Sequence, residues 1–359
     1  MVYKNIERLR KILKEELLNA DIRKPILLPF ESELLQKIIF DDDCLTISLG
    51  EVIQKIDFSN ISFDGYDLQT SVNNFEGFTG VKINPQTILN KDLCYSTFDG
   101  VEFIGSFDGT KINECNFKGS KGAKIDPQTV EGQILSGCIF KDVEFIGDFD
   151  GATIYDSNFS GSKGAKINPQ KIYDIDLENC NFKDAEFIGS FDGARIKGCC
   201  FEGSKNAKIN PQTINEKVLR KGNFKDVEFI GDFDGARINA ASFEGSKNAK
   251  INPQTISGKD LANTVCADVE FVGDFNGACI IGTNFKGSKG AKIDPQTIYE
   301  KALSNAVCAD VEFTNGFENV DTYNTSFEGS NYDKIVEFEQ IFREKIKSLV
   351  LTNLNDNNK

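Results

Sequence analysis

Carboxylates and lysines that recur at a fixed interval are the residues of this chain most able to do chemistry. One glutamate column repeats every 42 residues, at Glu102, Glu144, Glu186, Glu228, Glu270 and Glu312. Two aspartate columns accompany it, one at Asp142, Asp184, Asp226, Asp268 and Asp310 and the other at Asp108, Asp150, Asp192 and Asp234. All flank apolar residues expected to point inward, so we expect them to face solvent. The glutamates, with Asp150, Asp192 and Asp234, form the candidate binding surface.

Lysines form two further columns with the same interval. They lie at Lys82, Lys124, Lys166, Lys208, Lys250 and Lys292, and at Lys121, Lys163, Lys205, Lys247 and Lys289. We expect the surface to be acidic along some sides of the coils and basic along the KGSKGAK side. Such a surface either keeps the protein in solution or steers a basic partner toward it. The net charge of -14 argues against direct binding of nucleic acid.

Catalysis is not expected from these residues. The chain contains no histidine, which removes the most common general base and metal ligand. A catalytic carboxylate pair needs a pocket that separates two pKa values, whereas these carboxylates recur identically along a convex surface. Asp-Gly strings are frequent, but the GGxGxD nonapeptide of calcium-binding β-rolls is missing. The sequence predicts a non-enzymatic protein without a cofactor or a metal site.

Ten cysteines are spread along the chain without a CxxC pair, which is unlike a disulfide framework. Several fall at positions expected to point inward, namely Cys115, Cys138, Cys180, Cys199, Cys266 and Cys308. A buried free cysteine behaves as a small apolar side chain. Cys200 and Cys279 fall between inward positions, where packing near a corner is favoured over a reactive thiol.

Prolines identify the elements that must position these side chains. They recur every 42 residues, at Pro85, Pro127, Pro169, Pro211, Pro253 and Pro295. A fixed period of this length indicates a tandem array whose units bury their apolar faces against one another. Within a unit, large apolar residues recur mostly every five positions, as at Ile83, Ile88, Leu93, Phe98 and Phe103. Helices repeat at 3.6 residues and strands at two, so this spacing predicts a square coil with one inward residue per side.

Small or slender residues stand two positions before most of the large ones, as Cys180 does before Phe182 and Gly105 before Phe107. This alternation, over roughly residues 56–335, resembles the motif of the pentapeptide-repeat family: a small residue, a polar one, Leu or Phe, then two variable ones. The resemblance implies an all-β solenoid, a right-handed quadrilateral β-helix with four five-residue sides per coil. Each 42-residue repeat would supply two coils, and the chain about 13.

The sequence departs from the ideal motif at two places in each unit. Gln86 and Lys91 stand where small residues are expected, and KGSKGAK forms a long excursion between Phe117 and Ile125. The string Asn-Pro-Gln-Thr at 84–87 has the capping chemistry of a helix start, while the spacing of five continues through it. A single helical turn and a plain corner both remain open at this position.

The ends of a solenoid must be covered, because they expose unpaired backbone. Apolar stripes predict an N-terminal helical cap at 1–50 and a C-terminal capping helix at 332–351, around a β-helix at 51–331. Residues 352–359 are predicted to be a disordered tail. In DNA-mimicking members of the family a C-terminal element joins two molecules, so both a monomer and a homodimer through this helix remain open.

Composition supports a binding protein. No stretch approaches the roughly 18 continuous apolar residues of a membrane span, and the N-terminus lacks the core of a signal peptide, so we expect a cytoplasmic protein that does not contact membranes. The favoured function is a non-enzymatic scaffold that binds a protein partner through its long faces. The alternative is an acidic DNA mimic that binds DNA gyrase or topoisomerase IV and modulates it or protects it from quinolones. A continuous negative stripe would favour the alternative, and mixed charge would weaken it.

Overall fold

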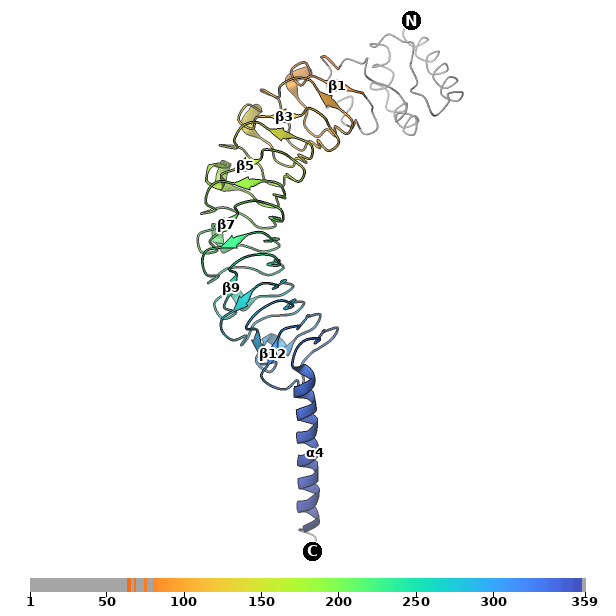
Figure 1. The fold of residues 1–359 in the computed structure, drawn as a ribbon, viewed down its shortest axis with the longest axis vertical. Coiled ribbons are helices and arrows are strands. Elements are labelled where there is room, and N and C mark those ends of the chain that lie inside the picture. The colour runs from red at the N-terminus through yellow and green to blue at the C-terminus, as the bar shows by residue number, and fades with distance from the viewer. Residues whose placement is uncertain (1–62, 66–67, 69–73, 76–79, 357–359) are drawn as a thin grey trace, which may run out of the picture. The chain divides into compact units, whose positions relative to one another are not determined.

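The structure is a computed structural model, and it describes residues 63–65, 68, 74–75 and 80–356. The expected cap at 1–50 lies outside the described residues. The chain divides into two compact units: unit 1 comprises Met1–Asp176 and Lys183–Glu186, and unit 2 comprises Leu177–Phe182 and Phe187–Lys359. Each unit is a β-solenoid, in which short coils stack and the labelled strands lie on successive repeats (Figure 1).

Unit 1 is built from two-residue parallel strands and short 3-10 turns. Its strands are β1 (Lys82–Ile83), β2 (Glu102–Phe103), β3 (Lys124–Ile125), β4 (Glu144–Phe145) and β5 (Lys166–Ile167). Its 3-10 turns are η2 (Leu89–Lys91), η3 (Glu131–Gln133), η4 (Pro169–Lys171) and η5 (Tyr173–Ile175). β1 pairs with β2 and β3 with β4. The strands are short because each side of a coil spans only about five residues before the chain turns.

Unit 2 repeats this plan and ends in a helix. Its strands are β7 (Lys208–Ile209), β8 (Glu228–Phe229), β9 (Lys250–Ile251), β10 (Glu270–Phe271), β11 (Lys292–Ile293) and β12 (Glu312–Phe313), while β6 (Glu186–Phe187) spans the boundary between the units. Its 3-10 turns are η6 (Asn215–Lys217), η7 (Ser257–Lys259) and η8 (Tyr299–Lys301). β7 pairs with β8, β9 with β10 and β11 with β12, all in parallel.

The pairing register shows that each repeat makes two coils of unequal length. Thr97 bridges to Asn116, 19 residues later, and Asn116 bridges to Ile139, 23 residues later. In unit 2, Ser242 bridges to Val265 and Val265 to Asn284 with the same two offsets, in the opposite order. Two successive offsets therefore make one 42-residue repeat, as predicted. The right-handed sense of winding and the total number of coils stay predictions.

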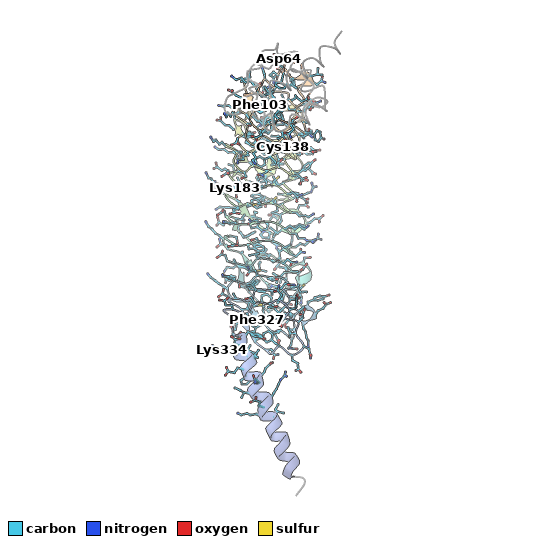
Figure 2. The ribbon with its side chains drawn as sticks, turned by 90° about the vertical axis from the view of Figure 1, so that its right-hand side faces the viewer. Asp64, Phe103, Cys138, Lys183, Phe327 and Lys334 are labelled. Atoms are coloured by element: carbon cyan, nitrogen blue, oxygen red, sulfur yellow. The ribbon has the colours of Figure 1, made fainter. Side chains whose placement is uncertain are left out.

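Phenylalanine rings fill the interior of each unit. In unit 1, Phe98 stacks on Phe117 with ring centroids 5.3 Å apart, and Phe117 stacks on Phe140 at 6.2 Å. In unit 2, Phe201 and Phe224 stack at 5.8 Å. Phe103, labelled among the coils in Figure 2, is buried and pairs with Ile83 of the preceding coil. The predicted inward positions of the large apolar residues are confirmed, with isoleucine and phenylalanine alternating in the Phe103 column.

The Asn-Pro-Gln-Thr corner is a capped turn. The Asn84 side-chain oxygen accepts a hydrogen bond from the Gln86 backbone N–H (3.1 Å), and the Thr87 N–H donates to the Asn84 carbonyl (3.0 Å). A 3-10 helix forms at this corner in the repeat of Pro169, where Asn168 is the N-cap. Gly105 is half-buried against the Asn84 side chain, so it allows a close approach there and does not fill the core as expected.

Gln86 and Lys91 depart from the small-residue pattern because they link adjacent coils. The Gln86 amide donates to the carbonyls of Ser106 (3.0 Å) and Asp108 (2.8 Å) of the next coil. The Lys91 ammonium donates to the Gln86 side-chain oxygen at 2.7 Å. The same link recurs in unit 2 between Lys217 and Gln212, at 2.5 Å.

The C-terminal helix α4 (Tyr332–Asp356) begins directly after the last coil (Figure 1). Tyr332 stacks on Phe327 with ring centroids 3.9 Å apart, and this contact joins the helix to the core. Apolar side chains farther along α4 are exposed, including Phe338 at 68%. The helix begins where the sequence placed one and continues past the expected end at residue 351 to Asp356.

Candidate functional site

The predicted glutamate column lies beside lysines on one side of the coils, which we call the ladder side. Glu102 pairs with Lys82 of the preceding coil and bridges to Lys121 of the following coil. The ion pairs are Lys82–Glu102 (3.7 Å) and Lys124–Glu144 (3.1 Å) in unit 1, and Lys208–Glu228 (3.1 Å), Lys250–Glu270 (3.1 Å) and Lys292–Glu312 (3.0 Å) in unit 2. All are exposed, so each contributes at most about 1 kcal/mol.

Charge on the ladder side therefore alternates along the stack. Opposite charges face one another across neighbouring strands, an arrangement that stabilises the pairing. The expectation of separate acidic and basic sides does not hold here, because the glutamate and lysine columns share one side. A duplex-DNA mimic needs a continuous negative surface, so this geometry favours a scaffold over DNA mimicry.

The Asp142 column closes corners between coils. Asp142 has a φ of 71°, and its Oδ2 accepts a hydrogen bond from the backbone N–H of Gly119 at 2.9 Å. Asp226 repeats this in unit 2, with a φ of 68° and a bond from Gly203 at 2.9 Å. Aspartate tolerates the left-handed conformation better than most residues, and here its side chain also satisfies a backbone donor. These carboxylates are structural.

Asp150, Asp192 and Asp234 lie on the next side of the coil from the glutamates, beside the Gln–Lys links. Asp150 pairs with Lys171 at 2.6 Å, and this hydrogen bond raises the pKa of the lysine. Hydrogen bonds from Thr213, and secondarily from Ser190, lower the pKa of the Asp192 carboxyl. The main-chain oxygen of Asp234 accepts from Gln212 at 2.8 Å. The structure thus does not bring the candidate acidic residues together on one surface.

A different side of the coils carries the residues that distinguish one repeat from another. We call it the variable side and define it by the outward residues of 89–95 and 110–114 and their equivalents at intervals of 42 residues. At 89–95 the repeats read LNKDLCY, EGQILSG, YDIDLEN, NEKVLRK, SGKDLAN and YEKALSN in turn. The two stretches stack on each other, as the bridges Val218–Arg237 and Asp260–Cys279 show. Periodicity identifies positions where the same residue type recurs. It therefore does not reveal the variable side, where the residues differ between repeats.

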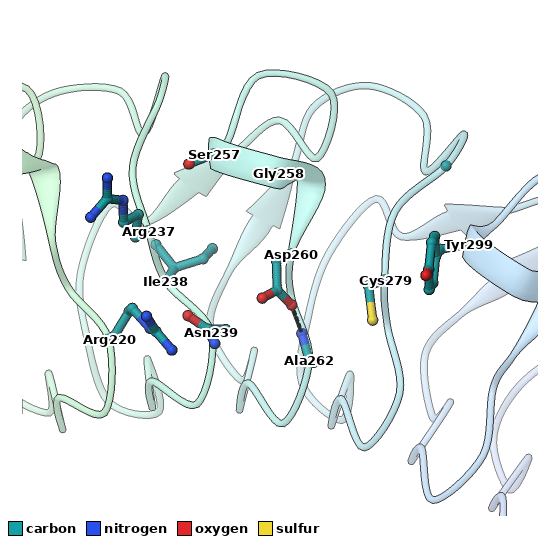
Figure 3. Close-up of a pocket in the computed structure, with 11 residues that line it drawn as sticks. Arg220, Arg237, Ile238, Asn239, Ser257, Gly258, Asp260, Ala262, Cys279 and Tyr299 are labelled. Carbon is teal, nitrogen blue, oxygen red and sulfur yellow. Dashed lines mark hydrogen bonds between the residues drawn. The ribbon is translucent and has the colours of Figure 1, made fainter.

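A groove of about 460 Å³ lies on the variable side of unit 2 (Figure 3). Arg220 and Arg237 line one end of it, and Cys279 and Tyr299 line the other. Asp260 lies between them, with its Oδ1 accepting a hydrogen bond from the Ala262 N–H at 2.9 Å. Its polar side chains come from consecutive coils, so the stacking of coils builds it.

The cysteines predicted to point inward are buried, and no cysteine among the described residues is joined in a disulfide. Cys138 is labelled among the coils of unit 1 in Figure 2, and burial raises the pKa of its thiol from 9.0 to about 12. Burial also raises the pKa of the Cys308 thiol in unit 2 from 9.0 to about 12. Cys200 and Cys279 are half-buried, as expected for positions between the inward ones.

The raised pKa values of these thiols predict that the free energy of unfolding falls at alkaline pH. A thiol that ionises near pH 9 when unfolded and near pH 12 when folded stabilises the fold below pH 9, and this contribution disappears as the pH rises toward 12. Ionisation of Cys138 and of Cys308 in the unfolded chain should each lower the free energy of unfolding at pH 10 by roughly 1 kcal/mol. Urea unfolding at pH 8 and pH 10 measures the drop. The drop should be smaller in a Cys138→Ala/Cys308→Ala variant, and an equal drop would contradict the assignment.

Two classes of feature are absent from the described part of the chain. No group of three or more Cys, Asp or Glu side chains is arranged to hold a metal ion among those residues. Within the same residues, no helix combines the length and the apolar character needed to span a bilayer.

Comparisons with known proteins add similarities of low identity. No protein-family model and no curated protein matches the chain. Among solved structures, it is similar to HetL, a pentapeptide repeat protein involved in heterocyst differentiation regulation from the cyanobacterium Nostoc sp. strain PCC 7120, with 11% identity over 67% of this chain and 84% of that one and a TM-score of 0.15. It is also similar to full-length QnrB1, a plasmid-mediated fluoroquinolone resistance protein, with 16% identity over 73% of this chain and 95% of that one and a TM-score of 0.13. The fold assignment therefore rests on the backbone pairing of the chain itself.

Proposed function

We propose that this chain, a β-solenoid consistent with the pentapeptide-repeat family, is a non-enzymatic cytosolic scaffold that binds a protein partner through its variable side. The observation that carries the proposal is the uneven distribution of sequence differences between repeats. The ladder side keeps its alternating charges and the proline corner keeps Asn/Asp-Pro-Gln in every repeat from residue 81. Differences gather on the variable side, where a specific partner would need chemistry that does not repeat.

Exposed aromatic and apolar residues also favour the variable side as the binding surface. Tyr95, Ile134 and Tyr155 in unit 1, and Tyr299 and Tyr323 in unit 2, are exposed there. Tyrosine is enriched at the energetic centres of protein interfaces, because its ring offers a large rigid contact and its hydroxyl a hydrogen bond. The ladder side instead presents long charged side chains, which interfaces disfavour at their centres.

Site-specific photo-cross-linking tests this proposal. A benzophenone amino acid at Lys221 or Asn263, both on the variable side of unit 2, should yield discrete cross-linked proteins in native cytosol. The same probe at Lys208 or Lys250, on the ladder side of the same unit, is the matched control and should yield none of these products. Equal products from both sides, or none from the variable side, would contradict a binding role for it.

A further inference from the structure

The groove on the variable side exists because the fifth repeat, residues 249–290, has small residues at two positions where the fourth repeat has long ones. Gly258 and Ala262 occupy positions that hold Glu216 and Arg220 in the fourth repeat. Gly258 has a φ of +64°, and a Cβ there would meet nothing within 4 Å. The hollow is therefore open space on the surface, bounded by Arg220 and Arg237 on one side and by Tyr299, which is 50% exposed, on the other.

Positive charge is concentrated at the arginine end of this groove, in a chain whose net charge is -14. The described coils contain three arginines, Arg195, Arg220 and Arg237, and all three lie on the variable side. Lys197 and Lys221 lie beside them, since Gly198 hydrogen-bonds to the Arg220 carbonyl and Lys221 to that of Asn239.

The two arginines of the groove differ in their ion pairing. Arg237 pairs with Glu216 at 3.5 Å, and both side chains are exposed. Among the described residues, the Arg220 and Lys221 side chains form no ion pair. Guanidinium groups present a planar fork of donors that matches a carboxylate, and arginine and tyrosine are both enriched at interface hot spots.

We infer that this groove binds an acidic segment of a protein partner, with Arg220 and Arg237 receiving its carboxylates. The inference rests on the proposed function and adds the chemistry of the partner. Asp260 selects a peptide over a nucleic acid or free phosphate, because a peptide carries N–H donors for Asp260 as well as carboxylates for the arginines. A nucleic-acid backbone or a free phosphate would bring negative charge against Asp260 and be repelled by it. The volume of about 460 Å³ suits a few residues of such a segment.

Binding of short fluorescent peptides to the full chain tests the inference. A peptide of alternating Glu and Gly with a terminal Phe should bind, and its Gln counterpart should not. An Arg220→Glu/Arg237→Glu variant should weaken binding by about tenfold or more. Gly258→Glu should also weaken it by placing a carboxylate in the groove. This substitution is compatible with the backbone, because Glu216 and Glu300 adopt positive φ at the same position.

The matched control changes the charge equally at positions away from the groove. Lys118→Glu/Lys286→Glu introduces residues that Glu202 and Glu244 already supply in other repeats, and it should leave binding unchanged. Circular dichroism confirms that each variant is folded. Peptide binding that does not depend on the two arginines, or no binding up to about millimolar peptide, would overturn the inference. Tighter arginine-dependent binding of duplex DNA or inorganic phosphate would overturn it too.

The two proposals fail separately. If cross-linking from Lys221 and Asn263 captures a partner while acidic peptides do not bind, the proposed scaffold function stands. The inference that the groove binds an acidic segment of the partner is then wrong. If neither experiment gives a positive result, both fail.

Discussion

Replacing Phe187 by alanine is expected to lower the free energy of unfolding by about 3–5 kcal/mol. The ring is 2% exposed, and its centroid lies 5.0 Å from that of Phe182, 4.8 Å from Phe191 and 5.7 Å from Phe201. Hydrogen bonds between coils hold the surrounding backbone, so the cavity left by the ring cannot readily collapse. Urea unfolding followed by circular dichroism measures the loss.

The neighbouring residue provides the control for this prediction. Ile188 is 56% exposed, so Ile188→Ala should change stability by less than about 0.5 kcal/mol. The two substitutions are adjacent in sequence and differ in the direction of the side chain. A loss at Phe187 as small as that at Ile188 would mean that the inward register is wrong.

Alkylation of the folded protein should spare the inward thiols Cys115, Cys138, Cys180 and Cys199. All four are buried, and the thiolate is the form that reacts. A pKa raised from 9.0 to about 12, as for Cys138, reduces the thiolate fraction near neutral pH about a thousandfold relative to the unfolded chain. Mass spectrometry of iodoacetamide-treated protein, native and in urea, measures this protection.

Half-buried thiols provide the comparison within the same molecule. Cys200 and Cys279 should be alkylated before the four inward thiols, because their side chains are partly accessible. After denaturation all six should react at similar rates. Rapid native labelling of the four inward cysteines would be incompatible with the stacked coils.

The fold was largely predictable, because packing constrains the same positions in every coil. A spacing of five placed Ile83, Ile88, Leu93 and Phe98 inside, and all are buried. Gly105 was misassigned because a missing side chain looks the same in sequence whether it fills a core or admits a neighbour. Asn84 of the preceding coil occupies that space.

The surface was harder to predict, because it depends on which coils become neighbours. Sequence intervals show that Lys82 and Glu102 each recur, but not that they face each other. That follows from a register offset of 20 residues within a repeat. The groove could not be predicted for a different reason: it arises where Gly258 and Ala262 stand at positions that Glu216 and Arg220 hold in the preceding repeat, and repeat spacing alone does not show which coils become neighbours.

The alternating ladder also limits how the length of such a molecule can change. Deleting the coil that carries Glu102 would set lysines of the two flanking coils opposite each other, since Glu102 now lies between Lys82 and Lys121. Removing a whole pair of coils preserves the alternation. Duplication or loss of coils should therefore change the length of the molecule in steps of 42 residues. This is the smallest step that leaves opposite charges facing each other on all neighbouring coils.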